Sequence, residues 1–277
     1  MKAKQYLLCL LLLCLLQPLA TTVVAQEQAQ LTYSHSTPIT SASAISQDRN
    51  GNLYLLDAKR NLLRLDAQGR PLDTYSPRTR GRITAIEAWN PMKIMLFYQD
   101  RQEVALLDRF LRPITSTRLS DYDYTGMVRV ASISSDDNLW LFNETEFTLS
   151  KLDIQRGSKA IETSLELILD REQFDVRQLR EYQNMLYMLD ANAGIYVFDN
   201  LGNYKQKLPY EGINYIGFSD NELYFVKEDK LHFRNLYQQQ EQVIKLPAAK
   251  QYTAALVSNE YAYLFSQKQL DVYTLKR

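Results

Sequence analysis

Residues 48–57 read DRNGNLYLLD, and residues 62–66 then read LLRLD. The first segment is a polar turn followed by an alternating apolar and aromatic strand. The second segment is another alternating strand, which ends in an aspartate. Asn50-Gly51 supplies the positive φ that a tight hairpin turn requires. The two segments together therefore predict an antiparallel β-hairpin.

The same hairpin recurs along the chain. The large residue in the middle of its first strand returns at intervals of roughly forty positions, at Tyr54, Met95, Trp140, Tyr187, Tyr224 and Tyr263. A further strand precedes each hairpin, at residues 39–45, 83–88, 128–133, 176–182, 213–218 and 252–257. A fourth strand follows, for example at residues 71–75, 113–119 and 204–208. Four strands in a repeat of this length are typical of one blade of a β-propeller.

The two ends of the repeat array predict that the ring closes. The sixth copy has no fourth strand after it, and residues 31–36 form a strand candidate that belongs to no other copy. Pairing between the two would remove the open sheet edges that favour aggregation. The sequence therefore predicts an all-β fold, a six-bladed β-propeller of four-stranded antiparallel blades closed by an N-terminal strand. An open β-solenoid is the alternative.

The start of the chain has the features of a secretory signal peptide. Lys2 and Lys4 precede a leucine-rich segment at residues 7–16, and residues 23–25 are small or β-branched. This order predicts cleavage after Ala25, which leaves a single propeller domain at residues 26–277. Both cysteines, Cys9 and Cys14, lie in the leader, so the mature chain is expected to hold no disulfide. We expect an exported protein of a Gram-negative bacterium, periplasmic or associated with the outer membrane, with no transmembrane segment in its mature form.

The turn sequences carry a family resemblance. Residues 48–57, followed by Asp66-Ala67-Gln68-Gly69, resemble the blades of six-bladed propellers of the NHL and TolB-like type. Those blades carry D-x-x-G-N-[IL]-Y-V-x-D, and a D-x-x-G turn follows their second hairpin strand. Asp199-Asn200-Leu201-Gly202 repeats that second turn. The resemblance implies a six-bladed propeller of the bacterial envelope and leaves the activity open.

Composition and motifs favour a protein without catalytic activity. Lysine and arginine together number 32, as do aspartate and glutamate, so the basic character of nucleic-acid binders is absent. The sequence contains none of the motifs of serine hydrolases, zinc peptidases, P-loop enzymes or dinucleotide-binding enzymes, and it has only His35 and His232 as histidines. We therefore expect no catalytic residue, no cofactor and no bound metal.

A second interpretation stays open beside this one. In hydrolases of the lactonase or phosphotriesterase type built on six-bladed propellers, oxygen ligands from the inner strands hold Ca²⁺ in the central channel. The corresponding candidates here are Glu87, Asn214 and Glu181. The alternative function is therefore a calcium-dependent hydrolase of that type.

The loops suggest where a binding scaffold would meet its partner. In a propeller, the links between blades share one face with the turns between second and third strands. Arginine and aromatic residues anchor many interfaces because they combine large contact area with hydrogen-bonding reach. On this face the sequence places the candidate partner-binding residues Arg78, Arg80, Arg82, Tyr122, Tyr124, Phe174 and Tyr210. The expected partner is another envelope protein, a peptide or a glycan, and the alternative is a solvated rim.

Overall fold

A computed structural model describes residues 29–39, 44–78, 81–248 and 250–277. The predicted signal peptide at residues 1–25 and the small residues 41–43 of the first predicted inner strand lie outside the described residues. Gln30–Lys276 forms one compact unit, and it is described here by itself.

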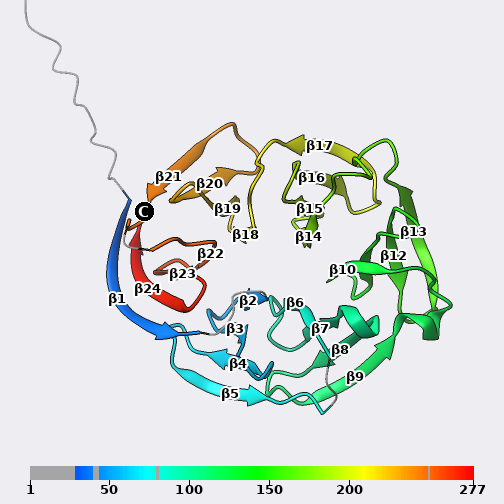
Figure 1. Cartoon of the computed structure of the whole chain (residues 1–277), viewed down its shortest axis with the longest axis horizontal. Helices are drawn as coiled ribbons and strands as arrows, with labels where there is room; N and C mark the ends of the chain where they lie inside the picture. Colours follow the sequence, from blue (N-terminus) through cyan, green and yellow to red (C-terminus); the bar gives the residue numbers. More distant parts are fainter. Residues whose placement is uncertain (1–28, 40–43, 79–80, 249) are drawn as a thin grey trace, which may run out of the picture. The chain divides into compact units, whose positions relative to one another are not determined.

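The unit is a six-bladed β-propeller, as the repeats predict (Figure 1). The strands of the first three blades are β2 Ile45–Gln47, β3 Leu53–Leu56, β4 Leu62–Leu65 and β5 Pro71–Tyr75; β6 Ile83–Glu87, β7 Ile94–Tyr98, β8 Glu103–Leu107 and β9 Pro113–Arg118; and β10 Val128–Ile133, β11 Leu139–Asn143, β12 Thr148–Asp153 and β13 Ser158–Ser164. The next two blades are β14 Val176–Tyr182, β15 Met185–Asp190, β16 Gly194–Asp199 and β17 Tyr204–Leu208; and β18 Gly217–Ser219, β19 Glu222–Lys227, β20 Lys230–Asn235 and β21 Glu241–Lys245. Two short 3₁₀ helices, η1 Gln99–Arg101 and η2 Leu119–Tyr122, lie in connections of the second blade and after it.

The sixth blade joins the two ends of the unit. It consists of β22 Ala254–Val257, β23 Tyr261–Phe265, β24 Gln269–Lys276 and the N-terminal strand β1 Gln30–Pro38. β1 pairs antiparallel with β24, from Gln30 opposite Lys276 to Pro38 opposite Gln269. This confirms the predicted pairing of residues 31–36 with the sixth repeat. In Figure 1 the first strand of each blade faces the centre of the ring, and the fourth strand lies on its outer edge.

The core lies between neighbouring blades. Each large residue that marked the repeat is buried, from Tyr54 to Tyr263. One buried cluster joins residues of blades 1 and 2, and others join blades 2 and 3, 3 and 4, 4 and 5, and 6 and 1. A blade therefore buries its two faces only against the next blade on each side, which is why a closed ring is needed.

One turn geometry recurs in the described part of the chain. Asp48 accepts hydrogen bonds from the backbone N–H of Asn50 at 2.8 Å and of Asn52 at 2.9 Å, and from Asn52 Nδ2 at 2.8 Å. Gly51, at the third position after the aspartate, has φ +86°. The same arrangement begins at Asp57, Asp66, Asp108 and Asp199. The third residue after the aspartate is left-handed in all five turns. It is a glycine in the three D-x-x-G sequences, and it is Arg60 and Leu111 in the other two.

The inner strands are shorter than the sequence predicted in three blades. β2 begins at Ile45 where the predicted segment ended, β18 begins at Gly217, and β22 begins at Ala254. Before β18, the side chain of Gln178 takes the place of a pairing strand. Its Oε1 accepts the backbone N–H of Ile216 at 2.9 Å, and its Nε2 donates to the Ile216 carbonyl at 2.9 Å. Gln102 bonds the N–H and carbonyl of Val128 in the same way, so glutamine amides join neighbouring blades where the backbone ladder stops.

Candidate functional site

The turns between the first and second strands of the blades meet at one mouth of the central channel. We call this side the turn face, and the side of the inter-blade links the link face. Two cavities, of about 410 Å³ and about 540 Å³, open on the turn face and share Arg49, Trp89 and Arg180 in their linings. We call the pair the turn-face cavity. Concave sites of this size are the usual location of ligand binding.

Trp89 is the most exposed aromatic side chain of this cavity. It follows β6 in the turn to β7, and 44% of its surface is exposed. Its ring meets that of Tyr182 edge-on, with centroids 6.1 Å apart and an interplanar angle of 79°. Tyr182 in turn stacks on Phe218 at 4.7 Å and donates its hydroxyl to the carbonyl of Asp220 at 2.8 Å. The indole is therefore exposed but held in a fixed orientation by packed neighbours.

A charged pair crosses the channel below Trp89. Glu87 is buried and accepts hydrogen bonds from Ser132 Oγ at 2.8 Å and from the N–H of Ile133 at 2.9 Å. Burial raises the pKa of Glu87, although the charge of Arg180 and these hydrogen bonds oppose the shift. Arg180 Nη1 lies 3.5 Å from Glu87 Oε1, and the guanidinium carbon lies 5.9 Å from the centroid of the Trp89 ring. Arg180 thus connects the buried carboxylate to the exposed indole.

Arg49 stands beside the indole on the first blade. Its backbone N–H donates to the carbonyl of Trp89 at 3.3 Å, which fixes the two turns together. The Arg49 side chain is exposed, and it forms no ion pair or hydrogen bond with the residues that the structure describes. Its guanidinium is therefore available to a ligand.

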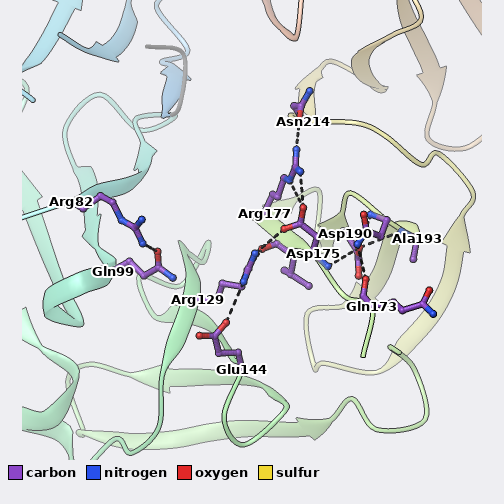
Figure 2. A network of polar contacts seen from close by, with 12 residues as sticks. Arg82, Gln99, Arg129, Glu144, Gln173, Asp175, Arg177, Asp190, Ala193 and Asn214 are labelled. Atoms are coloured by element: carbon purple, nitrogen blue, oxygen red, sulfur yellow. Dashed lines mark hydrogen bonds and ion pairs between the residues drawn. The ribbon is translucent and has the colours of Figure 1, made fainter. Parts of the chain in front are cut away.

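A polar network lies on the link face (Figure 2). Figure 2 shows Arg129 and Arg177, each near the start of an inner strand, pointing toward Asp175. Arg129 Nη2 lies 2.7 Å from Asp175 Oδ1, and Arg177 Nη2 lies 2.6 Å from Asp175 Oδ2. Arg129 also pairs with Glu144, and Arg177 donates to Asn214. These charges are satisfied by one another, so this network links blades 3, 4 and 5 rather than presenting free groups.

The candidate partner-binding residues fall into different environments on the link face. Arg78 and Arg82 are exposed, and Arg82 Nη2 donates to Gln99 Oε1 at 2.6 Å. Arg80 lies outside the described residues. Tyr122 and Tyr124 belong to the packing between blades 2 and 3, where Tyr124 is 6% exposed and its hydroxyl lies 2.7 Å from Ser150 Oγ.

The two later aromatic candidates also pack against blades. Phe174 contacts Phe142 and Phe147 with ring centroids 5.6 Å and 5.5 Å away. Tyr210 lies against Phe225 at 4.6 Å, and its hydroxyl donates to Glu241 Oε2 at 3.0 Å. The structure therefore does not gather the seven residues into one exposed patch, and their role in partner binding stays a prediction.

The calcium candidates are held apart by partners of their own. Glu181 accepts hydrogen bonds from Trp140 Nε1 at 2.5 Å and from the N–H of Ser135 at 3.1 Å. Asn214 is bonded to Arg177 and Glu87 to Ser132, as above. Across the described residues, no group of three or more histidine, cysteine, aspartate or glutamate side chains is placed to hold a metal ion.

The sequence reasoning missed Trp89, which is one of only two tryptophans in the chain. A signal was available, because Trp89-Asn90-Pro91 lies between two predicted strands, where a buried tryptophan is not expected. The other tryptophan, Trp140, is fully buried between blades 3 and 4.

Comparisons with known proteins identify the fold. No family model and no curated protein matches the chain. A streptogramin B lyase structure superimposes with a TM-score of 0.62 at 10% identity, covering 90% of this chain and 97% of that one. BamB from Moraxella catarrhalis superimposes with a TM-score of 0.53 at 11% identity, covering 90% of this chain and 98% of that one. The TM-score is 0.59, at 9% identity, with a catalytically inactive histidine-to-alanine variant of virginiamycin B lyase from Staphylococcus aureus, with quinupristin. The match covers 90% of this chain and 99% of that one. At such identities the chain is similar to these proteins in fold alone. No helix in the described ranges is long and apolar enough to span a membrane.

Proposed function

We propose that this chain is an exported, non-catalytic binding module of the Gram-negative cell envelope, which takes its ligand in the turn-face cavity. The observation that carries the proposal is Trp89, exposed at the channel mouth between Arg49 and Arg180. The partner is an envelope protein, a peptide or a glycan.

The residue types and their rigidity support binding at this place. Tryptophan, tyrosine and arginine are the types that dominate binding energy when they line a concave site. Trp89 is oriented by Tyr182 and Arg180 before any ligand arrives, so little side-chain entropy is lost on binding. Among the residues that the structure describes, the link face offers no comparable cluster, because its aromatic candidates pack between blades.

The lyase neighbours raise the question of catalysis, and the side chains argue against it. One of those neighbours is inactive after a histidine-to-alanine change. Here His35 lies on the outer strand β1 and His232 on the third strand β20, and neither lines the turn-face cavity. The calcium-dependent hydrolase would need Glu87, Glu181 and Asn214 to release the donors that now hold them.

Export is tested on the secreted protein itself. The predicted cleavage after Ala25 gives a mature chain that begins at Gln26, so we expect N-terminal sequencing of the periplasmic or membrane fraction to find that residue. A full-length chain in the cytoplasmic fraction would contradict export.

Photo-crosslinking decides which face binds. A benzophenone amino acid is introduced at Met92, which is 52% exposed in the same turn as Trp89, and in a second protein at the exposed Arg78 of the link face. We expect irradiation in envelope extract to add mass to the Met92 protein only, and the added mass to disappear when Trp89→Ala is combined with it. Adducts at Arg78 alone, or adducts at Met92 that survive Trp89→Ala, would overturn the site.

A further inference from the structure

We infer that the ligand of the turn-face cavity is an uncharged oligosaccharide. The inference rests on the proposed function and specifies its ligand. It is carried by a set of free side-chain amides that line the same two cavities as the exposed indole.

Four turns each place one asparagine in the lining of the cavity. These are Asn50 of blade 1, Asn90 of blade 2, Asn184 of blade 4 and Asn259 of blade 6. The side-chain amides of Asn50, Asn184 and Asn259 make no hydrogen bond with the described residues. Asn90 Oδ1 accepts the N–H of Met92 at 3.1 Å, which leaves its Nδ2 free. Each amide offers donors and an acceptor within one plane, and a sugar hydroxyl likewise donates and accepts.

The indole supplies the apolar half of such a site. A pyranose ring has a face of C–H groups and an edge of hydroxyl groups. The exposed, fixed ring of Trp89 can cover the C–H face, while amides on neighbouring turns reach the hydroxyls. An aromatic platform surrounded by free amides therefore matches the two-sided chemistry of a sugar.

Carboxylates outnumber cations in the lining of the turn-face cavity, six to three, which disfavours a polyanion. Lys93 Nζ lies 2.8 Å from Asp137 Oδ1, and Arg180 pairs with Glu87. Asp48 and Glu181 are occupied by the donors described above. The remaining cation, Arg49, shares its cavity lining with the exposed carboxylates Asp220 and Glu260. Four of the six carboxylates are thus engaged within the protein, and the charges left free for a ligand are those of Arg49, Asp220 and Glu260.

A peptide ligand is less well matched. Interfaces with protein segments are usually anchored by an apolar side chain in a desolvated pocket. Three aliphatic residues of the lining are covered by their neighbours, with Ile216 at 0%, Leu256 at 1% and Val257 at 4% exposure, and a fourth, Ile133, is half-buried. The cavity thus offers mainly hydrogen-bonding groups and aromatic rings, of which that of Trp89 is the most exposed, and little aliphatic surface.

Calorimetric titration of the mature protein with defined tetrasaccharides tests the inference. The probes are the β-1,4-glucose, α-1,4-glucose and N-acetylglucosamine tetramers, with the galacturonic acid tetramer as the anionic counterpart. We expect saturable binding of at least one neutral tetramer. We expect Trp89→Ala to weaken it about thirtyfold and Asn184→Ala about fivefold. Phe110→Ala is the matched control, because Phe110 is 52% exposed in a turn between β8 and β9 and lines neither cavity, and it should bind as the unaltered protein does.

The outcomes separate the ligand class from the binding site. Failure of all neutral tetramers to bind at millimolar concentration, binding of the anionic tetramer alone, or unchanged affinity in Trp89→Ala would each overturn the oligosaccharide. If the adduct at Met92 still depends on Trp89 but proves to be a peptide, the ligand class is wrong and the proposed site stands. Thermal melting of every variant confirms that lost binding does not come from lost folding.

Discussion

Asp271 holds together the two ends of the propeller, and its removal should loosen the ring. Its side chain, on β24, is fully buried. It accepts hydrogen bonds from Ser36 Oγ on β1, from the Tyr252 hydroxyl at 2.6 Å and from Lys250 Nζ at 2.7 Å. One carboxylate therefore joins the N-terminal strand, the C-terminal hairpin and the link that leads into the last blade.

The size of the effect follows from these contacts. Hydrogen bonds to a charged group contribute about 1.5–3 kcal/mol each, and donors left without an acceptor in a buried site cost more than their bond alone. Lys250 is one-third exposed and can recover water, so its share is smaller. We expect Asp271→Ala to lower the free energy of unfolding by about 3 kcal/mol, which for a domain of this size lowers Tm by about 6–12 °C.

The pKa of Asp271 predicts how the stability lost in Asp271→Ala changes with pH. Burial alone would raise the pKa of Asp271, but the hydrogen bonds from Lys250, Ser36 and Tyr252, with the Lys250 charge, outweigh it and lower the pKa. A carboxyl whose folded pKa is depressed adds stability above its unfolded pKa of about 3.9, and that stability is lost as the pH falls through the folded value. The difference in free energy of unfolding between the unaltered protein and Asp271→Ala should therefore be constant near neutral pH and decrease below about pH 4.

Urea and thermal unfolding at pH 7 and at pH 3 measure both effects. Ser36→Ala, which removes one donor and leaves the carboxylate in place, is the control and should cost only about 1 kcal/mol. An Asp271→Ala protein within about 0.5 kcal/mol of the unaltered one at pH 7, which is the size expected of a surface substitution, would refute the reasoning. A difference in free energy of unfolding that increases as the pH falls would refute the predicted pH dependence.

Three further outcomes follow from the described residues. Gly217→Ala should lower the free energy of unfolding in urea by about 2–3 kcal/mol, because the new Cβ meets the tyrosine ring opposite it on β19. Gly212→Ala, at φ +75° in open space, should lower it by only about 1 kcal/mol. Equal losses in the two variants would contradict the packing at Gly217. Acrylamide should quench the fluorescence of a Trp140→Phe protein strongly and that of a Trp89→Phe protein weakly, since only Trp89 is exposed; the reverse order would place the wrong indole at the channel mouth. Arg60→Gly should raise the free energy of unfolding by about 0.5 kcal/mol, because Arg60 holds φ +65° in its turn; a lower thermal midpoint would show that the side chain matters more than the strain.

The strand framework could be predicted from sequence because its signals are local. A hairpin strand such as Leu53–Leu56 shows its alternation within a few residues, and the carboxylate-capped turn at Asp48 needs only five. The pairing of β1 with β24 spans most of the chain, yet it could be predicted because one blade lacked a strand and one strand lacked a blade. The start of β18 could not, since the long-range amide of Gln178 replaces the missing ladder.

The side chains of the link face could not be assigned from sequence for a different reason. An aromatic residue in an inter-blade link can point to solvent or turn inward between two blades, and the hydrophobic gain favours burial when a neighbouring blade offers an apolar face. Tyr124 and Phe174 both turn inward. Their positions in the links are as predicted, but their surroundings depend on residues such as Ser150 and Phe142, which lie 26 and 32 positions away in the sequence, and no local pattern encodes such contacts.

On the turn face, the side chains can vary without disturbing the fold. The faces of the blades pack against neighbouring blades, and Arg129, Asp175 and Arg177 pair with one another on the link face. In the first blade, the turn is fixed by the Asp48 carboxylate, which accepts the backbone N–H groups of Asn50 and Asn52, so the Asn50 side chain is not needed to hold the turn. A ring of turns held by their own backbone contacts can therefore present different side chains at the channel mouth at little cost to stability. The exposed indole of Trp89 is then best explained by recognition, because burying it against the ring would have been the more stable arrangement.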